Sequence, residues 1–411
     1  MAHPQLISVD EAQRLIFSLA VPRLAHLCPL DSALGHVLGE SVVSREDSPP
    51  FDKSLVDGCA VRACDVSRIG GELRVLESIA AGEVPSQRVV AGTTSRIMTG
   101  APIPEGADAV VMCEYVESVP TGSGRETVRI GSAEIRAGQH ILRRGESIQR
   151  GAVALPAGRQ LRPVDIGVLA ALGVELVSAV ARPSVAIVAT GSELMPESGQ
   201  LGPAQIRNSN GPMLRALLGQ LAGRVNDLGI GPDSEEVLES LIQQGLESDV
   251  LLLSGGVSAG IHDLVPGVLD KLGVKRVFHK VNLKPGKPLW FGSTDSNGVN
   301  RLVFGLPGNP ASALVCFELF VRPALMRMGG VADASPRFGR ARLAADLLVR
   351  TDRLSFLPAR YFETEGGAAV ERVSWKGSAD LFGLSQASCL IRVPCGEYRL
   401  AAGQCVDVLW L

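Results

Sequence analysis

The sequence has little of what marks secreted, membrane-spanning or nucleic-acid-binding proteins. Its apolar runs are well below the ~20 residues that a membrane helix needs, and Met1–Gln5 form neither a cationic nor an apolar signal segment. A net charge of −3 gives no general attraction to nucleic acid or to an anionic membrane. We therefore expect a cytoplasmic protein without nucleic-acid or membrane partners, in which any anion site depends on charges placed locally.

Cysteine and histidine are few and dispersed. The eight cysteines contain no C-x-x-C pair, which argues against a zinc knot or a thioredoxin-like motif. The six histidines suggest no metal cluster, and no Ser-His-Asp or Cys-His arrangement can be recognised. The sequence therefore favours reduced cysteines and a site that does not use a nucleophilic triad.

At 411 residues, 46% of them hydrophobic, the chain is too long for one ordinary core. Helical periodicity follows the possible capping box Ser8–Glu11, and it returns in Val164–Leu172 before Gly173. Two other regions are β-rich, and one alternates strands with helices. The predicted fold is multidomain α/β plus β, with these domains: a discontinuous N-terminal helical and extended domain (1–50 with 143–180), an inserted β domain (51–142), a central α/β domain with a mostly parallel sheet (181–330) and a C-terminal β domain (331–411).

The predicted elements follow these regions. The inserted domain has strand patterns at Arg74–Ile79, Thr94–Met98, Ala109–Tyr115 and Thr127–Ile130. In the central domain, strands are predicted at Val185–Ala189, Val250–Leu253, Arg276–Val281 and Leu302–Phe304, and helices at Pro212–Leu221, Glu235–Leu246 and His262–Leu272. The C-terminal strand candidates are Ala341–Val349, Ala368–Val373, Cys389–Val393 and Val406–Leu409.

A glycine-rich run follows the apolar strand Val250–Leu253. The glycines of Ser254-Gly255-Gly256-Val257-Ser258-Ala259-Gly260 can adopt positive φ and let a ligand approach the backbone. A helix after this turn would direct free N–H groups at a bound anion. Asp263 is either the N-cap of that helix or an acid beside the anion, and the run itself could be no more than a tight turn.

Charged residues mark two further segments of the central domain. Lys280, Lys284 and Lys287 lie within eight residues around two prolines, so they form either a solvated charge run or a stiff cationic loop. Glu193 follows a buried strand and is a candidate metal-binding acid. Gly305-Leu306-Pro307-Gly308-Asn309-Pro310 ends another strand, with Asn309 as the expected N-cap of the last helix.

Two turn-rich segments near the inserted domain also carry candidate polar groups. In Phe51–Arg62, Asp57 is either part of a capped loop or a carboxylate for metal binding or proton transfer. In Met98–Asp108, Thr99 lies in a rigid Pro- and Gly-rich loop and could offer its hydroxyl to a ligand.

Taken together, these motifs resemble the molybdenum insertase family, the molybdopterin molybdenumtransferases, to which the C-terminal domain of gephyrin is related. The matching segments occur in family order along the chain: Pro50-Phe51-Asp52 to Asp57-Gly58 and Arg62, Thr99-Gly100-Ala101-Pro102, Gly145-Glu146, Thr190-Gly191-Ser192-Glu193-Leu194, Ser254-Gly255-Gly256-Val257-Ser258, Lys284-Pro285-Gly286-Lys287-Pro288 and Gly305-Leu306-Pro307-Gly308-Asn309-Pro310.

The resemblance implies a homodimer that converts adenylylated molybdopterin and molybdate into molybdenum cofactor and AMP with Mg²⁺. It implies a molybdopterin adenylyltransferase and recipient molybdoenzymes as possible partners, and a β domain of one subunit facing the α/β domain of the other. It assigns catalytic positions to Asp57, Thr99, Glu193, Asp263, Lys280 and Lys284, with Asp57, Glu193 and Asp263 as metal ligands. Substrate-binding positions are Ser254, Gly255, Gly256, Ser258, Gly260, Lys287, Pro307 and Asn309; Arg144 and Ser378 match possible molybdate contacts, and Arg360 is a weaker match.

Three positions depart from the family pattern. Ser147 and Asn208 stand where the family has acids, and Cys59 where it favours an aromatic residue. Fewer carboxylates weaken a site for a hard cation. The sequence therefore allows an active insertase, a non-catalytic carrier of molybdopterin or its nucleotide, or a transferase for another pterin or nucleotide.

Overall fold

The structure is a computed structural model that describes residues 6–69, 72–120, 126–131, 134–219, 221–257, 264–296 and 299–411. The chain forms two compact units. One contains residues 1–39, 158–162 and 176–411, and the other contains residues 40–157 and 163–175. The division into four domains stays a prediction.

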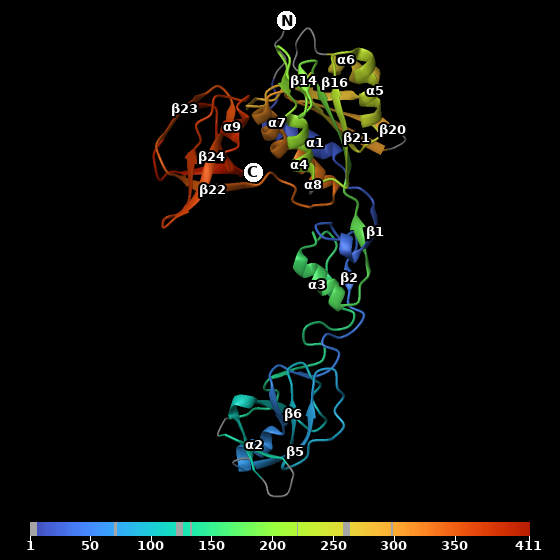
Figure 1. Ribbon diagram of the computed structural model, residues 1–411, viewed down its shortest axis with the longest axis vertical. Helices are drawn as coiled ribbons and strands as arrows, with labels where there is room; N and C mark the ends of the chain where they lie inside the picture. Colours follow the sequence, from blue (N-terminus) through green and yellow to red (C-terminus); the bar gives the residue numbers. More distant parts are fainter. Residues whose placement is uncertain are drawn as a thin grey trace. The chain divides into compact units, whose positions relative to one another are not determined.

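The larger unit contains a mixed six-stranded sheet (Figure 1). Its strands, in spatial order, are β16 (Arg224–Gly231), β13 (Ser184–Thr190), β17 (Val250–Ser254), β21 (Val299–Leu306), β20 (Trp290–Ser296) and β18 (Lys275–His279). The first four strands are parallel, and β20 runs antiparallel to both of its neighbours. The predicted, mostly parallel α/β sheet is therefore confirmed, although β16 and β20 were not among the predicted strands.

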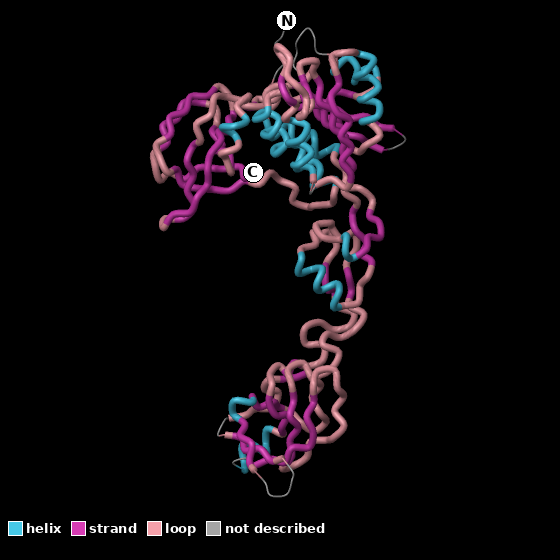
Figure 2. Tube along the Cα trace, in the orientation of Figure 1, coloured by secondary structure: helices cyan, strands magenta, loops and turns pink. Residues whose placement is uncertain are grey.

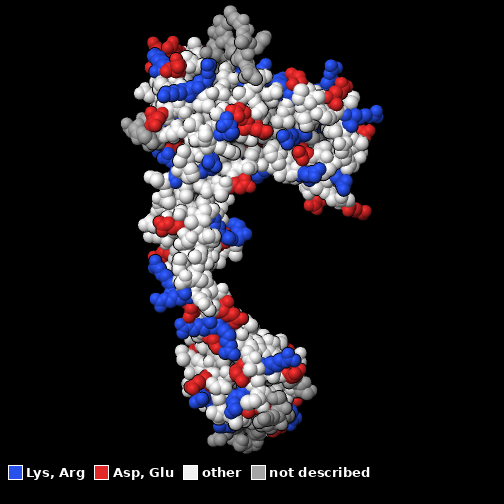
Figure 3. All heavy atoms as spheres, turned by 180° about the vertical axis from the view of Figure 1, so that it is seen from behind, with Lys and Arg blue, Asp and Glu red and all other residues white. Residues whose placement is uncertain are grey.

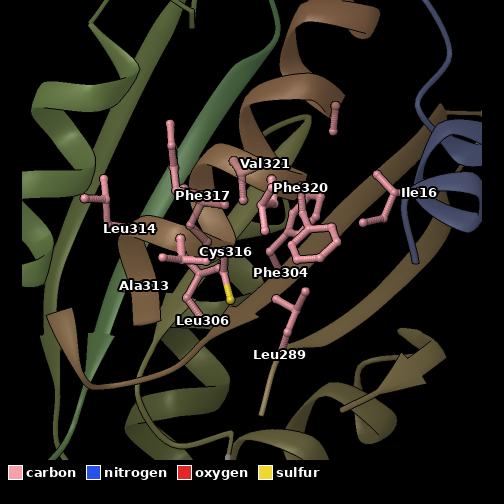
Figure 4. Close-up of a cluster of buried hydrophobic side chains, with 14 of the residues drawn as sticks. Ile16, Leu289, Phe304, Leu306, Ala313, Leu314, Cys316, Phe317, Phe320 and Val321 are labelled. Carbon is pink, nitrogen blue, oxygen red and sulfur yellow. The ribbon is translucent and has the colours of Figure 1, made fainter. Parts of the chain in front are cut away.

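Alternate residues of the central strands enter two separate cores. Val185 and Ile187 of β13 belong to one core, whereas Ala186 and Val188 belong to the other. This period of two with apolar residues on both sides is what a sheet covered on both faces requires. The first core includes the last helix of the sheet domain and Ile16 of the N-terminal helix (Figure 4).

The helices lie where their apolar periodicity places them. Helix α1 (Val9–Leu19) begins with the Glu11 N–H donating to Ser8 Oγ at 3.0 Å, but the Glu11 carboxylate binds Arg14, so the capping box is only half formed. The remaining helices of the sheet domain are α4 (Asn210–Leu218), α5 (Glu235–Gly245), α6 (Val265–Lys271), α7 (Pro310–Cys316) and α8 (Arg322–Met328). Phe317–Val321 form a π-helical segment that joins α7 to α8 without a break.

The C-terminal region is a closed barrel with one short helix between two of its strands. Strands β24 (Leu354–Thr364), β25 (Gly367–Arg372), β22 (Phe338–Leu343), β28 (Cys405–Trp410) and β26 (Cys389–Val393) pair in this order, and β26 pairs back onto β24. The predicted strand Ala341–Val349 is in fact two strands, because residues 344–346 separate β22 from β23 (Leu347–Thr351). β23 pairs with β27 (Gly396–Leu400), and α9 (Leu381–Leu384) precedes β26.

The smaller unit consists mainly of strands and loops, with two short helices among its described residues (Figure 2). Its six-stranded sheet has the order β7 (Ala109–Met112), β4 (Gly58–Val61), β6 (Thr93–Ile97), β5 (Glu72–Ile79), β9 (Thr127–Ile130) and β8 (Val116–Val119). The predicted strand Ala109–Tyr115 is shorter, because Cys113–Tyr115 form a 3₁₀ turn. Helix α3 (Pro163–Ala171) ends two residues before Gly173, the predicted C-terminal glycine, which has φ +66 and donates its N–H to the Ala170 carbonyl oxygen.

The surface and the cysteines agree with the composition. Basic and acidic side chains are interspersed over the face in Figure 3, as expected for a nearly neutral chain. All eight cysteines are free, and four of them are buried. No helix in the described part of the chain is long and apolar enough to cross a membrane.

Candidate functional site

A cleft of about 1410 Å³ lies in the larger unit, where the parallel strands of the sheet end. One wall is made by the loops that follow β13, β17 and β21, together with Leu283–Pro288. The C-terminal region makes the other wall, and its lining residues lie within two segments, 348–357 and 372–382. Parallel strands bring the loops at their carboxyl ends to one edge of the sheet, so ligand sites of α/β sheets gather there.

The turn after β17 has a backbone that only glycine adopts without strain. Gly255 has φ +97 and Gly256 has φ +62. A Cβ atom on Gly255 would lie 2.5 Å from the Thr190 carbonyl oxygen, and one on Gly256 would lie 2.7 Å from Thr190 Oγ1. The predicted glycine turn is thus present and is pressed against the end of β13. The predicted ligand residues Ser258, Gly260 and Asp263 lie outside the described residues.

One buried side chain connects this turn to the next loop. Asn210 Nδ2 donates to Ser254 Oγ at 2.9 Å and to the Gly308 carbonyl oxygen at 2.8 Å. The turn is also held by the Gly255 N–H, which donates to the Leu306 carbonyl oxygen, and by His279 Nε2, which lies 2.9 Å from the Val257 carbonyl oxygen. Sequence reasoning had not singled out Asn210, whose only signal is its place in the first turn of α4.

The lysine-bearing loop is fixed from two sides. Leu283–Lys284 form strand β19, which pairs with the start of β24 in the barrel. Gly286 has φ +119, and its carbonyl oxygen accepts a hydrogen bond from the buried Cys316 thiol at 3.6 Å. Lys284 and Lys287 both line the cleft, as predicted, whereas Lys280 is not among its lining residues.

The cleft has a local excess of positive charge. Its described lining contains six cationic and two acidic side chains, although the whole chain has a net charge of −3. The cations are Arg207, Lys284, Lys287, Arg350, Arg353 and Arg372. The four arginines were missed. Arg350, Arg353 and Arg372 belong to the barrel, and strand patterns do not show which barrel residues will face the sheet domain; Arg207 lies in the short strand β15 (Ile206–Arg207), which the sequence did not predict.

The two acids are Glu193 and Asp233. Glu193 was predicted, and Asp233 was missed because the strand before it, β16, was missed too. Asp233 is held by a reciprocal pair of bonds, in which the Ser192 N–H donates to Asp233 Oδ2 and the Asp233 N–H donates to Ser192 Oγ. In the described part of the chain, no three His, Cys, Asp or Glu residues form a group able to hold a metal ion on their own.

The remaining predicted site residues of the larger unit do not all line the cleft. Ser378 lines the cleft, and its Oγ accepts a hydrogen bond from Asn309 Nδ2 at 3.0 Å. Asn309 is the N-cap residue of α7 as predicted, but its side chain binds Ser378 and makes no cap bond. Pro307 lines the cleft as well, whereas Arg360 is not among the lining residues and pairs with Glu371 at 3.3 Å.

Asp57 and Thr99 meet in the smaller unit. Asp57 Oδ1 accepts hydrogen bonds from the Thr99 N–H and from the Thr99 hydroxyl, both at 2.7 Å. These two donors, the N–H first, hold the pKa of the Asp57 carboxyl below its usual value. The carboxylate is thus ionised at neutral pH, and Oδ2 accepts neither of these bonds.

Arg144, the predicted oxyanion contact, is engaged by acids of its own unit. Its Nε donates to Asp47 Oδ2 at 2.7 Å, and its backbone N–H donates to Asp52 Oδ1 at 2.8 Å. The neighbouring Arg143 also pairs with Asp52, at 2.6 Å. An oxyanion at Arg144 would therefore have to share or displace the Asp47 carboxylate.

The structure accounts for two of the three residues that depart from the family pattern, Asn208 and Cys59, but not for the third, Ser147. Asn208 Oδ1 accepts the Gly211 N–H at 3.0 Å in the first turn of α4, whose N-cap residue is Ser209. Cys59 is fully buried in β4, and burial raises the pKa of its thiol. Ser147 donates its backbone N–H to the Ser48 carbonyl oxygen, and nothing in the structure explains its side chain.

The glycine turn can be tested with two alanine substitutions. Gly256→Ala forces a left-handed conformation that costs an L-residue about 1–2 kcal/mol, before any contact with Thr190 is counted. Gly267 in α6 is the control, since a Cβ atom there meets nothing within 4 Å and its φ is not positive. We expect Gly256→Ala to lower the melting temperature and weaken pyrophosphate binding, and Gly267→Ala to do neither. Equal melting curves for the two variants would contradict the described turn.

The Asp57–Thr99 contact predicts a measurable pKa change. Thr99→Val removes the hydroxyl bond and keeps the N–H bond, so the pKa of Asp57 should rise while staying below its ordinary value. Because the folded pKa is depressed, the contact stabilises the fold at neutral pH and is lost as the pH falls through the folded pKa. Carboxyl-carbon NMR titration measures the shift, and Asp52, held by other donors, is the internal control. An unchanged Asp57 pKa in the variant rules the hydroxyl bond out.

The comparisons with known proteins cover the chain almost end to end. Residues 7–173 match the MoeA N-terminal region (domain I and II), residues 186–327 match a probable molybdopterin binding domain, and residues 340–411 match the MoeA C-terminal region (domain IV). The chain is 35% identical to the molybdopterin molybdenumtransferase of Staphylococcus aureus (strain Mu50 / ATCC 700699), over 98% of this chain and 95% of that protein. It is 34% identical to the molybdopterin molybdenumtransferase of Staphylococcus epidermidis (strain ATCC 12228 / FDA PCI 1200), with the same coverage.

Solved structures give the same result. The molybdopterin biosynthesis moeA protein from Pyrococcus horikoshii OT3 is similar with a TM-score of 0.79 and 30% identity, over 99% of this chain and 100% of that chain. The molybdenum cofactor biosynthesis protein from Pyrococcus furiosus has the same fold, with a TM-score of 0.58 and 20% identity. By sequence and by fold, over nearly its whole length, the chain belongs to the molybdopterin molybdenumtransferase family of molybdenum cofactor biosynthesis.

Proposed function

We propose that the chain takes adenylylated molybdopterin and molybdate as substrates and releases AMP as molybdenum enters the cofactor. The observation that carries this proposal is the cationic cleft at the edge where the parallel strands end, which six basic side chains line from its two walls. The substrate has a pyrophosphate link, and such a cleft suits a polyanion. Its glycine turn allows the phosphates to approach the main chain closely.

The chemistry of the link defines what the cleft must do. In the release of AMP, a water oxygen attacks the phosphorus of the adenylate and stays on AMP, its released proton passes to solvent, the P–O bond to the molybdopterin phosphate breaks, and that phosphate leaves as an oxyanion with its electron pair. Lys284 and Lys287 are placed to stabilise the negative charge on the phosphoryl oxygens, since both line the cleft on a fixed loop. Molybdate, itself an anion, is attracted by the same field.

Glu193 and Asp233 fit the Mg²⁺ ion that we propose for this reaction. Mg²⁺ is commonly held by one or two carboxylates together with substrate phosphates, and these two acids lie in the same cleft as the cations. When bound, the ion would neutralise charge on the phosphate oxygens. Among the described residues no third His, Cys, Asp or Glu joins them in a metal-binding group, which is consistent with a metal that binds along with the substrate.

We also propose that the chain forms a homodimer. Strands β1 (Ala25–Pro29) and β12 (Leu176–Val180) form a two-stranded ribbon in which Pro29 lies opposite Leu176. Leu27 and Leu176 are exposed, whereas Cys28 and Val177, on the other face, are buried. Isolated two-stranded ribbons are marginally stable, and an exposed apolar face marks an association surface. We propose a second copy of the chain as the occupant, because two-fold dimers are the commonest assemblies of soluble proteins.

The remaining proposals concern context. A molybdopterin adenylyltransferase would supply the substrate, and molybdoenzymes would receive the product. The eight free cysteines favour a reducing compartment, and we place the reaction in the cytoplasm.

The reaction is tested by AMP release. The wild-type chain should release AMP from adenylylated molybdopterin when molybdate and Mg²⁺ are present, and Lys284→Gln should reduce kcat/KM by about tenfold or more, since a bond to a charged group contributes roughly 1.5–3 kcal/mol. Lys271→Gln is the matched control, because Lys271 is also ion-paired and is 54% exposed compared with 52% for Lys284, but it lies outside the cleft. AMP release no faster than in a protein-free control would reject the proposed reaction.

The dimer is tested by light scattering. The wild-type chain should have about twice the 43.2 kDa of one chain, and Leu27→Glu should shift it towards the monomer, since a buried unpaired charge is costly. Val84→Glu, at an exposed loop position of the smaller unit, should leave the mass unchanged. A dimer that tolerates Leu27→Glu would exclude the ribbon as its interface.

A further inference from the structure

The wall of the cleft formed by the C-terminal region presents one unusually exposed aromatic side chain. Phe382 lines the cleft and is 88% exposed, twice the value of the next most exposed phenylalanines, Phe338 and Phe51, at 44% and 43%. A phenylalanine so open to water gains almost nothing from the fold. Its position next to a cationic cleft needs an explanation other than packing.

The backbone that carries Phe382 is firmly held. In α9, the Asp380 carboxylate accepts the N–H groups of Gly383 and Lys376, both at 2.9 Å. Leu384 is buried in the main core, and Leu381 packs against it. Of the side chains in this short helix, Phe382 alone is open to solvent, and it is presented by neighbours that are fixed on both sides.

The same segment also reaches the anion-binding side of the cleft. Ser378, four residues before Phe382, binds Asn309 through its hydroxyl, and its carbonyl oxygen accepts the Ala311 N–H at 3.1 Å. One short stretch of chain therefore runs from the loop after β21 to the exposed ring. A ligand with phosphates at the cationic loops and a planar ring attached to them could meet both ends of this stretch.

We propose that Phe382 is a specificity-determining residue whose ring stacks on a heteroaromatic ring of the phosphate-bearing substrate. The inference rests on the proposed function, whose substrate carries two such rings, an adenine and a pterin. Stacking on a phenylalanine whose backbone is already fixed orders only the two side-chain torsions of the ring, and it accepts any planar base. Phosphate binding would fix the position of the ligand, and the ring would select nucleotide or pterin phosphates over other polyanions.

The experiment compares ligands with and without a ring. Isothermal titration calorimetry would measure AMP, a pterin monophosphate and inorganic pyrophosphate binding to the wild-type chain and to Phe382→Ala, Phe382→Tyr and Leu348→Ala. Leu348 is a matched control because it is an exposed apolar residue of the same cleft. We expect Phe382→Ala to weaken binding of at least one ring-bearing ligand by about tenfold, in line with base–aromatic stacking, and to leave pyrophosphate binding unchanged.

The other variants separate stacking from a general effect. Phe382→Tyr should restore the affinity, and Leu348→Ala should leave it unchanged. The ligand whose binding is weakened by Phe382→Ala identifies the stacked ring as adenine or pterin. In the AMP-release assay, the same Phe382→Ala variant should raise KM more than it lowers kcat.

Two results would overturn the inference while leaving the proposed function intact. One is unchanged affinity of Phe382→Ala for both ring-bearing ligands. The other is an equal loss of affinity for all three ligands, which would mean that the substitution disturbs the cleft as a whole. If the wild-type chain binds none of the ligands and releases no AMP, the proposed function fails and the stacking proposal fails with it.

Discussion

The cleft depends on the close approach of backbone turns at one edge of the parallel sheet, and Asn210 holds two of these turns together. Its amide nitrogen donates to both Ser254 and Gly308, while its Oδ1 is buried without a hydrogen-bond partner. An unsatisfied buried acceptor costs roughly 1–3 kcal/mol. This cost is offset by the two hydrogen bonds that Asn210 donates, which set the distance between the loops. The short distances from a Cβ atom placed on Gly255 or Gly256 to Thr190 show how closely the loops approach each other.

An exposed acid, Asp352, pairs with two of the cations that line the cleft. Asp352 is exposed and lies 3.7 Å from Lys284 Nζ and 3.2 Å from Arg353 Nε. Hydrogen bonding to a backbone N–H, together with Arg353 and Lys284, holds the pKa of Asp352 below its usual value, so it is ionised at neutral pH. Exposed ion pairs contribute little stability, about 0–1 kcal/mol. Asp352 can therefore relieve the repulsion among the cations without competing strongly with substrate phosphates.

Much of this fold and part of the site could be predicted from the sequence. The apolar runs of β13 and β17 end in Gly191 and Gly255, and an apolar run followed by glycine identifies both a buried strand and the turn after it. β24 was missed because Pro358 and alternating polar residues break its pattern, yet it pairs with three neighbours in the barrel. β16 was missed because Asn226, Asp227 and Gly229 interrupt its apolar run at the edge of the sheet.

The site residues that the sequence did not reveal were missed for similar reasons. Asp233 could not be identified without β16, and Arg350, Arg353 and Arg372 face the cleft only because the barrel packs beside the sheet domain. Such packing is a long-range tertiary event that leaves no local periodicity in the sequence. The glycine and lysine loops were identified because their function requires unusual residues in consecutive positions, whereas an arginine contributed by a barrel strand looks like any exposed residue.

An asparagine at position 208, where the family pattern predicts an acid, changes the charge of the cleft and leaves its frame in place. Asn208 Oδ1 accepts the Gly211 N–H in the first turn of the helix that carries Asn210, and an aspartate oxygen could accept the same bond. What the replacement removes is a negative charge among the residues that line the cleft. In a cleft lined by six cations and two acids, each lost carboxylate would weaken binding of the proposed Mg²⁺ ion and strengthen the attraction for phosphate and molybdate. Under the proposed reaction, the metal would then bind mainly through the substrate, so that metal and substrate enter the cleft together.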